Sequence, residues 1–341
     1  MIIPLFLEVG EYAINKLTDL LKRNDLLFKR TLLITDEKVY NIIGMDIEHL
    51  LKTQGSNIRK IYIKGNTTQW VKKVKKEIII FSPHIILAVG GGKVIDVTKY
   101  AASFGDINFI SIPSLLSNDG ILSPVAVIDG HSLGAKIPIG VIIDLKVLKQ
   151  SPKRNIRAGI GDLISNLSAV EDCKLAIRKN KDKINNFALL ISEVAAELIL
   201  DNDQLDISST KFIKRLAEGM MLGGIAMAIA NSSRPASGSE HEISHAIDEI
   251  FPSKALHGEQ VAIGTIFTLY LQRNLNFEKV RNFFRYYGVP TKLSDLQLSL
   301  DDFVKVVIHA PSTRKGRYTI LEELSMDEDR IKDAAIESGI C

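Results

Sequence analysis

The sequence predicts two domains: an α/β domain with a doubly wound parallel sheet (residues 1–150) and, after it, an all-helical domain (residues 151–341). Two observations predict the first domain. Short runs of Ile, Val and Leu recur through it, and polar, helix-periodic segments separate these runs. A third predicts the second domain, since after about residue 150 the strand-like runs give way to long segments with helical periodicity. A length of 341 residues agrees with one or two domains.

Five short runs in the first domain are rich in Ile, Val and Leu and lack a clean period of two, which is typical of buried parallel strands. They are RTLLITD (30–36), IRKIYIK (58–64), HIILAVG (84–90), NFISIPS (108–114) and IPIGVIID (137–144). The polar-periodic segments TQWVKKVKKEIII (68–80) and KVIDVTKYAAS (93–103) are expected to be crossover helices of βαβ units. This pattern is that of a Rossmann-like domain, which binds ligands at the carboxyl ends of its strands.

Long helix-periodic segments dominate the rest of the chain. They are GDLISNLSAVEDCKLAI (161–177), NNFALLISEVAAELIL (185–200), STKFIKRLAEGMMLGGIAMAIAN (209–231) and GEQVAIGTIFTLYLQRNL (258–275). The connection DLKVLKQSPKRNIRAG (144–159), with its proline and its charges, is the expected domain boundary.

Composition argues against several classes of protein. A hydrophobic fraction of 46% with 24% charged residues is typical of a folded globular protein. The net charge of +3 and one lysine-rich helical segment, VKKVKKE (71–77), do not indicate a nucleic-acid-binding protein. Cys173 and Cys341 do not have the pattern of a disulfide framework, and no stretch approaches the roughly 18 apolar residues of a membrane span. We therefore expect a cytoplasmic protein that neither inserts into a membrane nor binds nucleic acid.

Three consecutive glycines, Gly90–Gly92, stand between a predicted strand and a predicted helix. Residues without Cβ let the backbone approach a phosphate closely, and the start of a helix offers free N–H donors. The run matches neither the GxGxxG fingerprint nor the P-loop, so a tight turn that requires glycine is the alternative. The strand–glycine–helix context favours a site for the pyrophosphate of a dinucleotide.

Small polar side chains gather after the next strand, in SIPSLLSNDGILSPVAVI (111–128). A cofactor in a doubly wound sheet lies at such a strand end, although a plain polar turn is the alternative. The polar residues of this stretch are Ser114, Ser117, Asn118, Asp119 and Ser123. Asp36, at the end of an earlier strand, is a candidate partner for an adenosine ribose hydroxyl, and its charge would oppose the extra phosphate of NADP.

Two histidines four residues apart, His241 and His245, occur in the stretch GSEHEISHAID (238–248). Residues i and i+4 share one face of a helix, so both can reach one metal ion, but packed or hydrogen-bonded histidines are the alternative. His257 precedes another helix, and Asp162 stands at the predicted start of a third, where its alternative role is an N-cap. One Asp and two His would suit a catalytic Zn²⁺ with an open position, although no local motif such as HExxH assembles them.

Taken together, these motifs resemble the superfamily of iron-containing alcohol dehydrogenases, glycerol dehydrogenases and dehydroquinate synthases. The order in that superfamily is a GGG turn, a Ser/Asp-rich strand end, a GD pair, a histidine pair on a helix, and HGE. The corresponding residues here are Gly90–Gly92, Ser114–Ser123, Gly161–Asp162, His241 with His245, and His257–Glu259. The match is collinear over essentially the whole chain and implies the dehydroquinate synthase-like fold.

Within this superfamily the chain looks most like the sn-glycerol-1-phosphate dehydrogenase family. The segments that carry this resemblance are GGGKVIDVTKYAA, SNDGILSPVAVI, GIGDLISNLSAVEDCKLA, SSRPASGSEHEISHAID, HGEQVAIGT and GRYTIL. One departure is Asp172-Cys173, where the family usually has Asp-Trp, and we interpret it as a change in packing. A glycerol dehydrogenase-like or dehydroquinate synthase-like enzyme is the alternative, but a synthase usually has glutamate as its first metal ligand, and this chain has Asp162.

The resemblance implies roles for individual residues. The implied metal ligands are Asp162, His241 and His257, with His245 close by rather than bound. The residues implied to bind the nicotinamide cofactor are Gly90, Gly91, Gly92, Lys93, Asp96, Ser114, Ser117 and Ser123. Asp119 matches a position between cofactor and substrate, and it joins His245 as a catalytic candidate.

The implied reaction is the reversible reduction of dihydroxyacetone phosphate by NAD(P)H to sn-glycerol 1-phosphate, a precursor of archaeal-type membrane phospholipids. Charge develops on the carbonyl oxygen, so a Lewis-acidic Zn²⁺ would stabilise it, and Ni²⁺ or Fe²⁺ would suit the same ligands. His245 is the candidate for proton delivery and Arg234 for binding the substrate phosphate. We expect a homo-oligomer, and the choice between NADH and NADPH stays open. The non-enzymatic alternative is a homologue that has lost turnover, although the three ligands and the glycine turn are all present.

Overall fold

The computed structural model describes residues 4–201, 205–252, 255–325 and 327–341. The chain forms two compact units, one made of Met1–Pro152 with Ser208–Gly224 and the other of Lys153–Ile207 with Ile225–Cys341. The change in periodicity predicts a boundary at residue 150 and places Ser208–Gly224 in the second domain, whereas this segment packs with the first unit. It holds most of α10 (Thr210–Ala230). Helical periodicity shows that a face is buried, but not against which core.

A six-stranded sheet forms the centre of the first unit. Its strands are β1 (Phe6–Gly10), β2 (Arg30–Thr35), β3 (Asn57–Tyr62), β4 (Ile85–Gly90), β5 (Phe109–Pro113) and β8 (Gly140–Asp144). They are ordered β1-β8-β5-β4-β2-β3, and every neighbouring pair is parallel, which confirms the predicted parallel sheet. The sequence does not predict β1, because this edge strand is only partly buried and lacks a continuous apolar run. A separate antiparallel pair consists of β6 (Val125–Ile128) and β7 (His131–Gly134).

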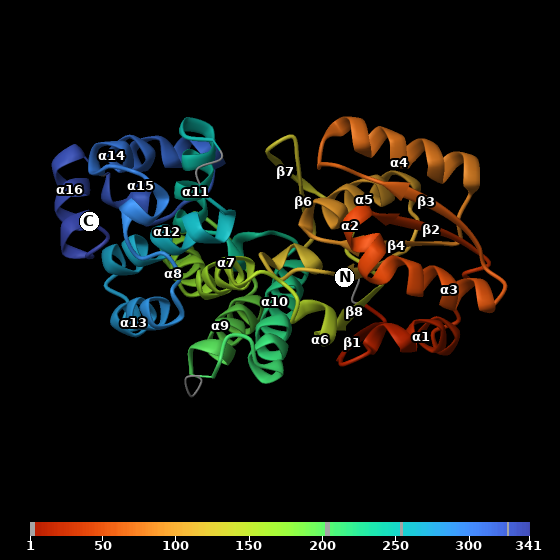
Figure 1. Ribbon diagram of the computed structural model, residues 1–341. Coiled ribbons are helices and arrows are strands. Elements are labelled where there is room, and N and C mark those ends of the chain that lie inside the picture. Colours follow the sequence, from red (N-terminus) through yellow and green to blue (C-terminus); the bar gives the residue numbers. More distant parts are fainter. Residues whose placement is uncertain (1–3, 202–204, 253–254, 326) are drawn as a thin grey trace. The chain divides into compact units, whose positions relative to one another are not determined.

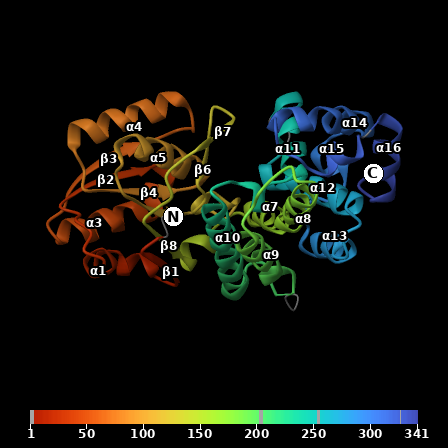
Figure 2. The ribbon, with the colours of Figure 1, turned by 180° about the vertical axis from the view of Figure 1, so that it is seen from behind.

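Helices cover both faces of the six-stranded sheet. They are α1 (Leu17–Arg23), α2 (Glu37–Val39), α3 (Met45–Thr53), α4 (Thr68–Phe81), α5 (Gly92–Gly105) and α6 (Leu145–Leu148). In both Figure 1 and Figure 2, α1 and α3 lie on one side of the sheet and α4 and α5 on the other. On the first side, Leu87 and Ile110 of the sheet form one buried core with Leu17 and Ile47 of the helices. Removal of these side chains from water is the main force that holds the helices on the sheet.

The direction of the chain across the sheet changes between β2 and β4. The strand after β2 adds on one side and the strand after β4 adds on the other. The helices α3 and α5, which follow these strands, lie on opposite faces (Figure 1). Such a switch point is where doubly wound sheets bind ligands. Asp36 directly follows β2 and Gly91 directly follows β4, so two predicted cofactor residues flank the switch point.

The second unit consists of helices, with no strand among the residues that the structure describes. Besides the end of α10, they are α7 (Lys153–Ile164), α8 (Asn166–Arg178), α9 (Asn186–Leu200), α11 (Ser239–Ile250), α12 (His257–Leu271), α13 (Phe277–Tyr287), α14 (Leu300–His309), α15 (Ile320–Leu324) and α16 (Glu328–Glu337). The helix α12 packs against α7, α11 and α13. In the described part of the chain, no helix has the length and apolar character to cross a membrane.

The helices α7 and α12 touch through their backbones because both carry glycine at the contact. A Cβ atom on Gly161 would lie 2.2 Å from the carbonyl oxygen of Gly258. A Cβ atom on Gly258 would lie 1.9 Å from the carbonyl oxygen of Ala158. Both distances are too short for any side chain, so only glycine permits this approach. Asp162 follows the first glycine and His257 precedes the second, and the contact therefore brings these two residues together.

Candidate functional site

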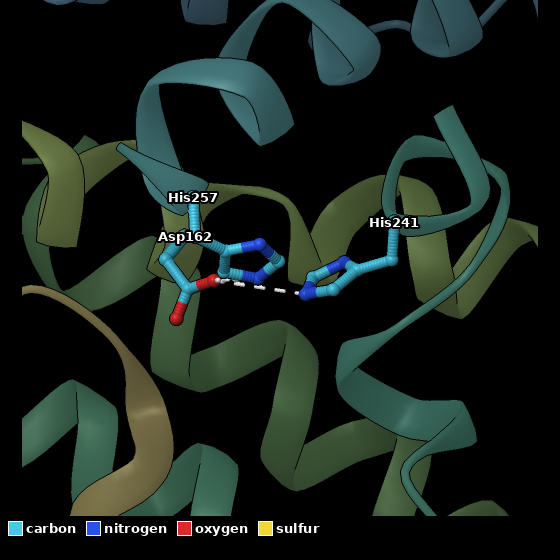
Figure 3. Close-up of side chains that lie close together, drawn as sticks. All are labelled: Asp162, His241 and His257. Carbon is cyan, nitrogen blue, oxygen red and sulfur yellow. Dashed lines mark ion pairs between the residues drawn. The ribbon is translucent and has the colours of Figure 1, made fainter. Parts of the chain in front are cut away.

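Asp162, His241 and His257, the three predicted metal ligands, lie together in the second unit. Each offers one ligand atom, and these atoms all lie within 4.8 Å of one another. The Oδ1 atom of Asp162 is 3.6 Å from Nε2 of His241 and 3.5 Å from Nε2 of His257. Figure 3 shows the carboxylate directed toward the two rings. One carboxylate and two imidazoles suit Zn²⁺, Ni²⁺ or Fe²⁺ and leave coordination positions open for a substrate.

Three helix ends supply these side chains. Asp162 lies in the last turn of α7, His241 in the first turn of α11, and His257 is the first residue of α12. The alternative role of Asp162 as an N-cap is wrong, because the residue is buried within a helix that begins at Lys153. The sequence indicates a new helix at Asp162 because the two preceding glycines, separated by an isoleucine, interrupt the helical pattern.

Glu240 contacts the His241 ring on the side away from Asp162. Its Oε1 atom lies 2.9 Å from Nδ1 of His241 and accepts a hydrogen bond of 2.6 Å from the backbone N–H of Gly238. Burial lowers the pKa of His241, but the contacts with Asp162 and Glu240 outweigh burial and raise the pKa to about 9. The two carboxylates thus stabilise a positive charge at this position. A hydrogen bond from Nδ1–H to Glu240 leaves Nε2 as the ligand atom toward a metal ion.

A chain of hydrogen bonds orients His257 in a similar way. Its Nδ1 atom is 3.0 Å from Oγ of Ser244, and that hydroxyl donates to Oε1 of Gln260 at 2.7 Å. The Gln260 amide donates in turn to Asp248 at 2.8 Å. Because the Ser244 proton is directed to Gln260, Oγ accepts from Nδ1–H of His257, and Nε2 keeps its lone pair. Burial and the nearby His241 lower the pKa of His257, which favours the neutral ring that a metal ligand requires.

His245 lies one helical turn after His241, beside the three candidate ligands but outside their group. Its ring centroid is 6.1 Å from that of His257, and its Nε2 atom lies 2.7 Å from Nη2 of Arg314. Burial, and then the charge of Arg314, lower the pKa of His245 to about 2. The ring is therefore neutral at pH 7, with Nε2 accepting from Arg314 and the proton on Nδ1. The sequence gives no sign of this contact, since Arg314 is 69 residues away in the chain.

Arg234, the predicted phosphate ligand, is buried at the start of a short 3-10 helix, Arg234–Ala236. Its Nη2 atom donates to the carbonyl oxygen of Tyr318 at 2.9 Å, and its Nε atom lies 3.1 Å from Oδ2 of Asp182. Within the described residues its Nη1 atom has no hydrogen-bond acceptor. Its charge is thus paired with Asp182, while Nε, like Nη1, makes no hydrogen bond within the described residues.

The glycine turn and the polar strand end lie side by side in the first unit. Gly90 ends β4 opposite the last residue of β5, and the backbone N–H of Ser114 donates to the Gly90 carbonyl at 3.0 Å. Gly91 precedes the first turn of α5, and Gly92 begins it. The Oγ atom of Ser114 is buried and has no partner among the described residues. An orphaned hydroxyl beside free helix N–H groups fits a phosphate-bearing cofactor, because such groups need an acceptor that the protein does not supply.

Lys99 holds two of the predicted cofactor residues in place. This lysine of α5 is fully buried, and its Nζ atom donates to Oγ of Ser123 at 3.0 Å and to the carbonyl oxygen of Val125 at 2.9 Å. It also lies 3.8 Å from Oδ1 of Asp96, whose Oδ2 accepts from the backbone N–H of Val127 at 3.2 Å. Burial raises the pKa of Asp96 to about 6. Asp96 and Ser123 therefore support the β6 segment from within, a function that the sequence does not reveal.

The other predicted cofactor residues share the same edge of the sheet with fewer contacts. The side chain of Asp36 caps α2 by accepting from the backbone N–H of Val39 at 2.9 Å. Lys93 is exposed in the first turn of α5, while Ser117 is partly exposed. Asp119 begins the 3-10 helix Asp119–Ile121, which Asn118 caps. Their roles in binding the cofactor stay predictions.

The substitution Lys99→Met is expected to lower the free energy of unfolding of the first unit by on the order of 3 kcal/mol, because it leaves the Asp96 carboxylate buried without its cation. Loss of the cation raises the Asp96 pKa further. A raised native pKa makes stability fall as pH rises, so the loss should be larger at pH 8 than at pH 5. Urea unfolding at both pH values measures this, with Lys38→Met on the exposed face of α2 as the control. Equal unfolding midpoints for Lys99→Met and the wild type would contradict the role of Lys99 as the cation that stabilises the buried Asp96 carboxylate.

Comparison with known families supports the likeness seen in the sequence. The profile of the iron-containing alcohol dehydrogenase family matches residues 8–152. A glycerol-1-phosphate dehydrogenase (NAD(P)+) of Thermococcus sibiricus is 35% identical, with 100% of this chain and 98% of that protein covered. A protein of the same name from Pyrococcus furiosus is 34% identical, covering 97% of this chain and 96% of its own length.

Solved structures share the fold at lower sequence identity. A probable glycerol dehydrogenase from Sinorhizobium meliloti superposes with a TM-score of 0.79 at 22% identity, covering 98% of this chain and 96% of that one. The glycerol dehydrogenase from Schizosaccharomyces pombe gives a TM-score of 0.81 at 20% identity, covering 98% and 89%. At these identities the likeness shows the fold, which is the one expected for a dehydroquinate synthase-like protein.

Proposed function

The chain belongs to the glycerol-1-phosphate dehydrogenase family, and on that premise we propose that it reduces dihydroxyacetone phosphate to sn-glycerol 1-phosphate with NAD(P)H. The observation that supports this most directly is the convergence of Asp162, His241 and His257. The product would serve as a backbone for archaeal-type membrane phospholipids. The family resemblance extends over the whole chain, so both the dinucleotide-binding edge and the ligand residues are present.

The donor set of Asp162, His241 and His257 fits one divalent metal ion. Such an ion acts as a Lewis acid when bound and stabilises the negative charge that develops on the carbonyl oxygen. Glu240 and Ser244 hold the two imidazoles so that both Nε2 atoms face Asp162, which limits the loss of entropy on binding the substrate oxygen. The nicotinamide supplies the hydride, and Gly90–Gly92 with Ser114 would bind its pyrophosphate.

His245 is the proposed donor toward the substrate oxygen. Its Nε2 atom is occupied by Arg314, so only Nδ1–H is left to donate. A neutral ring in this state acts as a hydrogen-bond donor that orients the oxygen and passes a proton through water, rather than as a free imidazolium acid. Asp119 and Arg234 are proposed to contact the substrate, as the resemblance and the charge of Arg234 respectively suggest.

Several finer features belong to the same proposal. We assign Zn²⁺ as the metal, with Ni²⁺ or Fe²⁺ as alternatives that metal analysis of the purified protein decides. Asp36 favours NADH over NADPH, because a carboxylate repels the 2′-phosphate of NADP. The cytoplasm as location and a homo-oligomeric state complete the proposal, and cell fractionation and light scattering test them.

Removal of the metal is expected to abolish the reduction of dihydroxyacetone phosphate. Dialysis against a chelator should lower the rate by at least ~10³-fold, since the lost Lewis acid is worth several kcal/mol in the transition state. Adding back Zn²⁺ should restore activity, measured as oxidation of NADH or NADPH. Chiral analysis of the product identifies the enzyme. Formation of sn-glycerol 3-phosphate, or no reduction by the untreated protein, would overturn the proposed function, while reduction of dihydroxyacetone alone would indicate a glycerol dehydrogenase.

A further inference from the structure

Three arginines gather beside the candidate metal centre in the second unit: Arg234, Arg314 and Arg317. Arg314 ends the 3-10 helix Ala310–Arg314 and contacts His245, as described above. The Nη1 atom of Arg317 donates to the hydroxyl of Ser237 at 2.8 Å. Arg314 and Arg317 are partly exposed, whereas Arg234 is buried. Arg314 and Arg317 are therefore more accessible to a ligand than Arg234.

The positive charges of these three arginines lie close enough together to act on one another. Arg234 has an ion pair with Asp182. Arg317, in contrast, donates to the hydroxyls of Ser233 and Ser237 and to the Ser237 carbonyl, and within the described residues no carboxylate lies within 4.0 Å of it. Burial, and then the charges of Arg234 and Arg314, lower the pKa of Arg317 to about 10. Cations packed in this way are stabilised by a bound anion.

We propose that Arg314 and Arg317 form the subsite that binds the phosphate group of the substrate. This inference rests on the proposed function. The Nη2 atom of Arg314 is 2.7 Å from His245, whose ring centroid is 6.1 Å from that of the candidate ligand His257, so one side chain separates the guanidinium from the candidate ligands. In dihydroxyacetone phosphate, one methylene and one ester oxygen separate the carbonyl carbon from the phosphorus. The proposed arrangement places the carbonyl oxygen at the candidate ligands and the phosphate at Arg314, with His245 next to both.

The forked guanidinium group of arginine suits phosphate binding better than the ammonium group of lysine. Two parallel N–H donors match two phosphate oxygens, and their strength grows where water is partly excluded. Arg314 also contacts His245, so binding of the phosphate would fix the position of the ring that donates to the substrate oxygen. Arg234 contributes charge, but it is buried and has an ion pair with Asp182, so a ligand reaches it less easily than the two partly exposed arginines. The proposed subsite thus has Arg314 and Arg317 as its main residues, whereas the sequence predicts Arg234.

The test compares a phosphorylated with an unphosphorylated substrate. For Arg314→Met and Arg317→Met we expect the KM for dihydroxyacetone phosphate to rise by roughly 10- to 100-fold, as loss of a charge-assisted hydrogen bond implies. For Arg317→Met the kcat/KM for dihydroxyacetone, read at high enzyme concentration, should change by less than about threefold. Arg314→Met also removes the partner of His245, so kcat should fall for both substrates while KM rises only for dihydroxyacetone phosphate. Arg285→Met, on the exposed face of α13, is the matched control and should leave both values unchanged. An equal fall in kcat/KM for both substrates in Arg317→Met, or an unchanged KM for dihydroxyacetone phosphate in both variants, would overturn the subsite.

A binding measurement separates this inference from the proposed function. Calorimetric titration of the zinc-loaded protein with inorganic phosphate requires no turnover, and Arg314→Met should weaken binding by at least about tenfold relative to Arg285→Met. Arg314→Lys keeps one charge but not the fork, and it should bind phosphate with intermediate affinity. If the wild type binds phosphate through Arg314 but does not reduce dihydroxyacetone phosphate, the proposed function fails alone. If it reduces that substrate and Arg314→Lys and Arg314→Met both bind phosphate like the wild type, the subsite fails alone.

Discussion

Replacement of His241 by alanine is expected to release the metal ion and to lower kcat/KM for dihydroxyacetone phosphate by at least ~10³-fold. The substitution removes one of three candidate ligands and also leaves the Glu240 carboxylate buried without the ring that it contacts. Two remaining ligands hold a divalent ion weakly, because each ligand adds to affinity and fixes the geometry of the others. Metal content after gel filtration and the rate with NADH or NADPH are the two measurements.

Two other histidines serve as comparisons for this result. His245→Ala should keep the metal and lose rate, since the ring contacts Arg314 and not the candidate ligand group. His309→Ala should keep both, because this partly exposed histidine pairs with Glu249 on the surface. A His241→Ala protein that still carries one equivalent of metal would show that the ion, if bound, has other ligands. Loss of metal from His245→Ala would assign that residue to the ligand set.

Local patterns in the sequence predict most of the sheet, because its central strands are rich in Ile, Val and Leu, and β4 (IILAVG) is apolar and buried at every position. The same reasoning explains the failure at β1, whose sequence FLEVG includes a glutamate on a partly exposed edge. Residues Ser208–Gly224 show a second limit of such patterns. A helix that packs against the core of the first unit has the same periodicity as one that packs in the second, so composition does not assign it to a unit.

In the candidate site, too, the sequence predicts some of the functional residues and misses others. The i, i+4 histidine pair and the collinear order of motifs point to Asp162, His241 and His257, and the structure brings these three together. The sequence does not predict the residues that orient these ligands and shift their pKa values. Glu240 is adjacent to His241 in the chain, but an acidic residue at the start of a helix has an ordinary explanation in the helix dipole. Arg314 reaches His245 from 69 residues away, and only the packing of the chain shows such a contact.

Gly258→Val is expected to destabilise the second unit by on the order of 3 kcal/mol or more and to reduce metal binding at the same time. The Cβ atom would lie 1.9 Å from the Ala158 carbonyl oxygen and 2.5 Å from its carbonyl carbon, so α7 and α12 must separate. Backbone atoms, unlike a flexible side chain, cannot yield without moving a whole helix. Asp162 and His257 are the direct neighbours of the contact glycines, and their 3.5 Å approach would be lost with it.

Two measurements separate a change in packing from a change at the metal centre. Urea unfolding gives the loss of stability, and Gly134→Ala, where a Cβ would meet no atom within 4 Å, is the control that should unfold like the wild type. Added Zn²⁺ should stabilise the wild type by about 2.7 kcal/mol at a concentration one hundred times its Kd, because the ion binds only the folded chain. Gly258→Val should lose most of this gain. A variant that is less stable but gains as much from Zn²⁺ would show that the helix contact supports the fold without positioning the ligands.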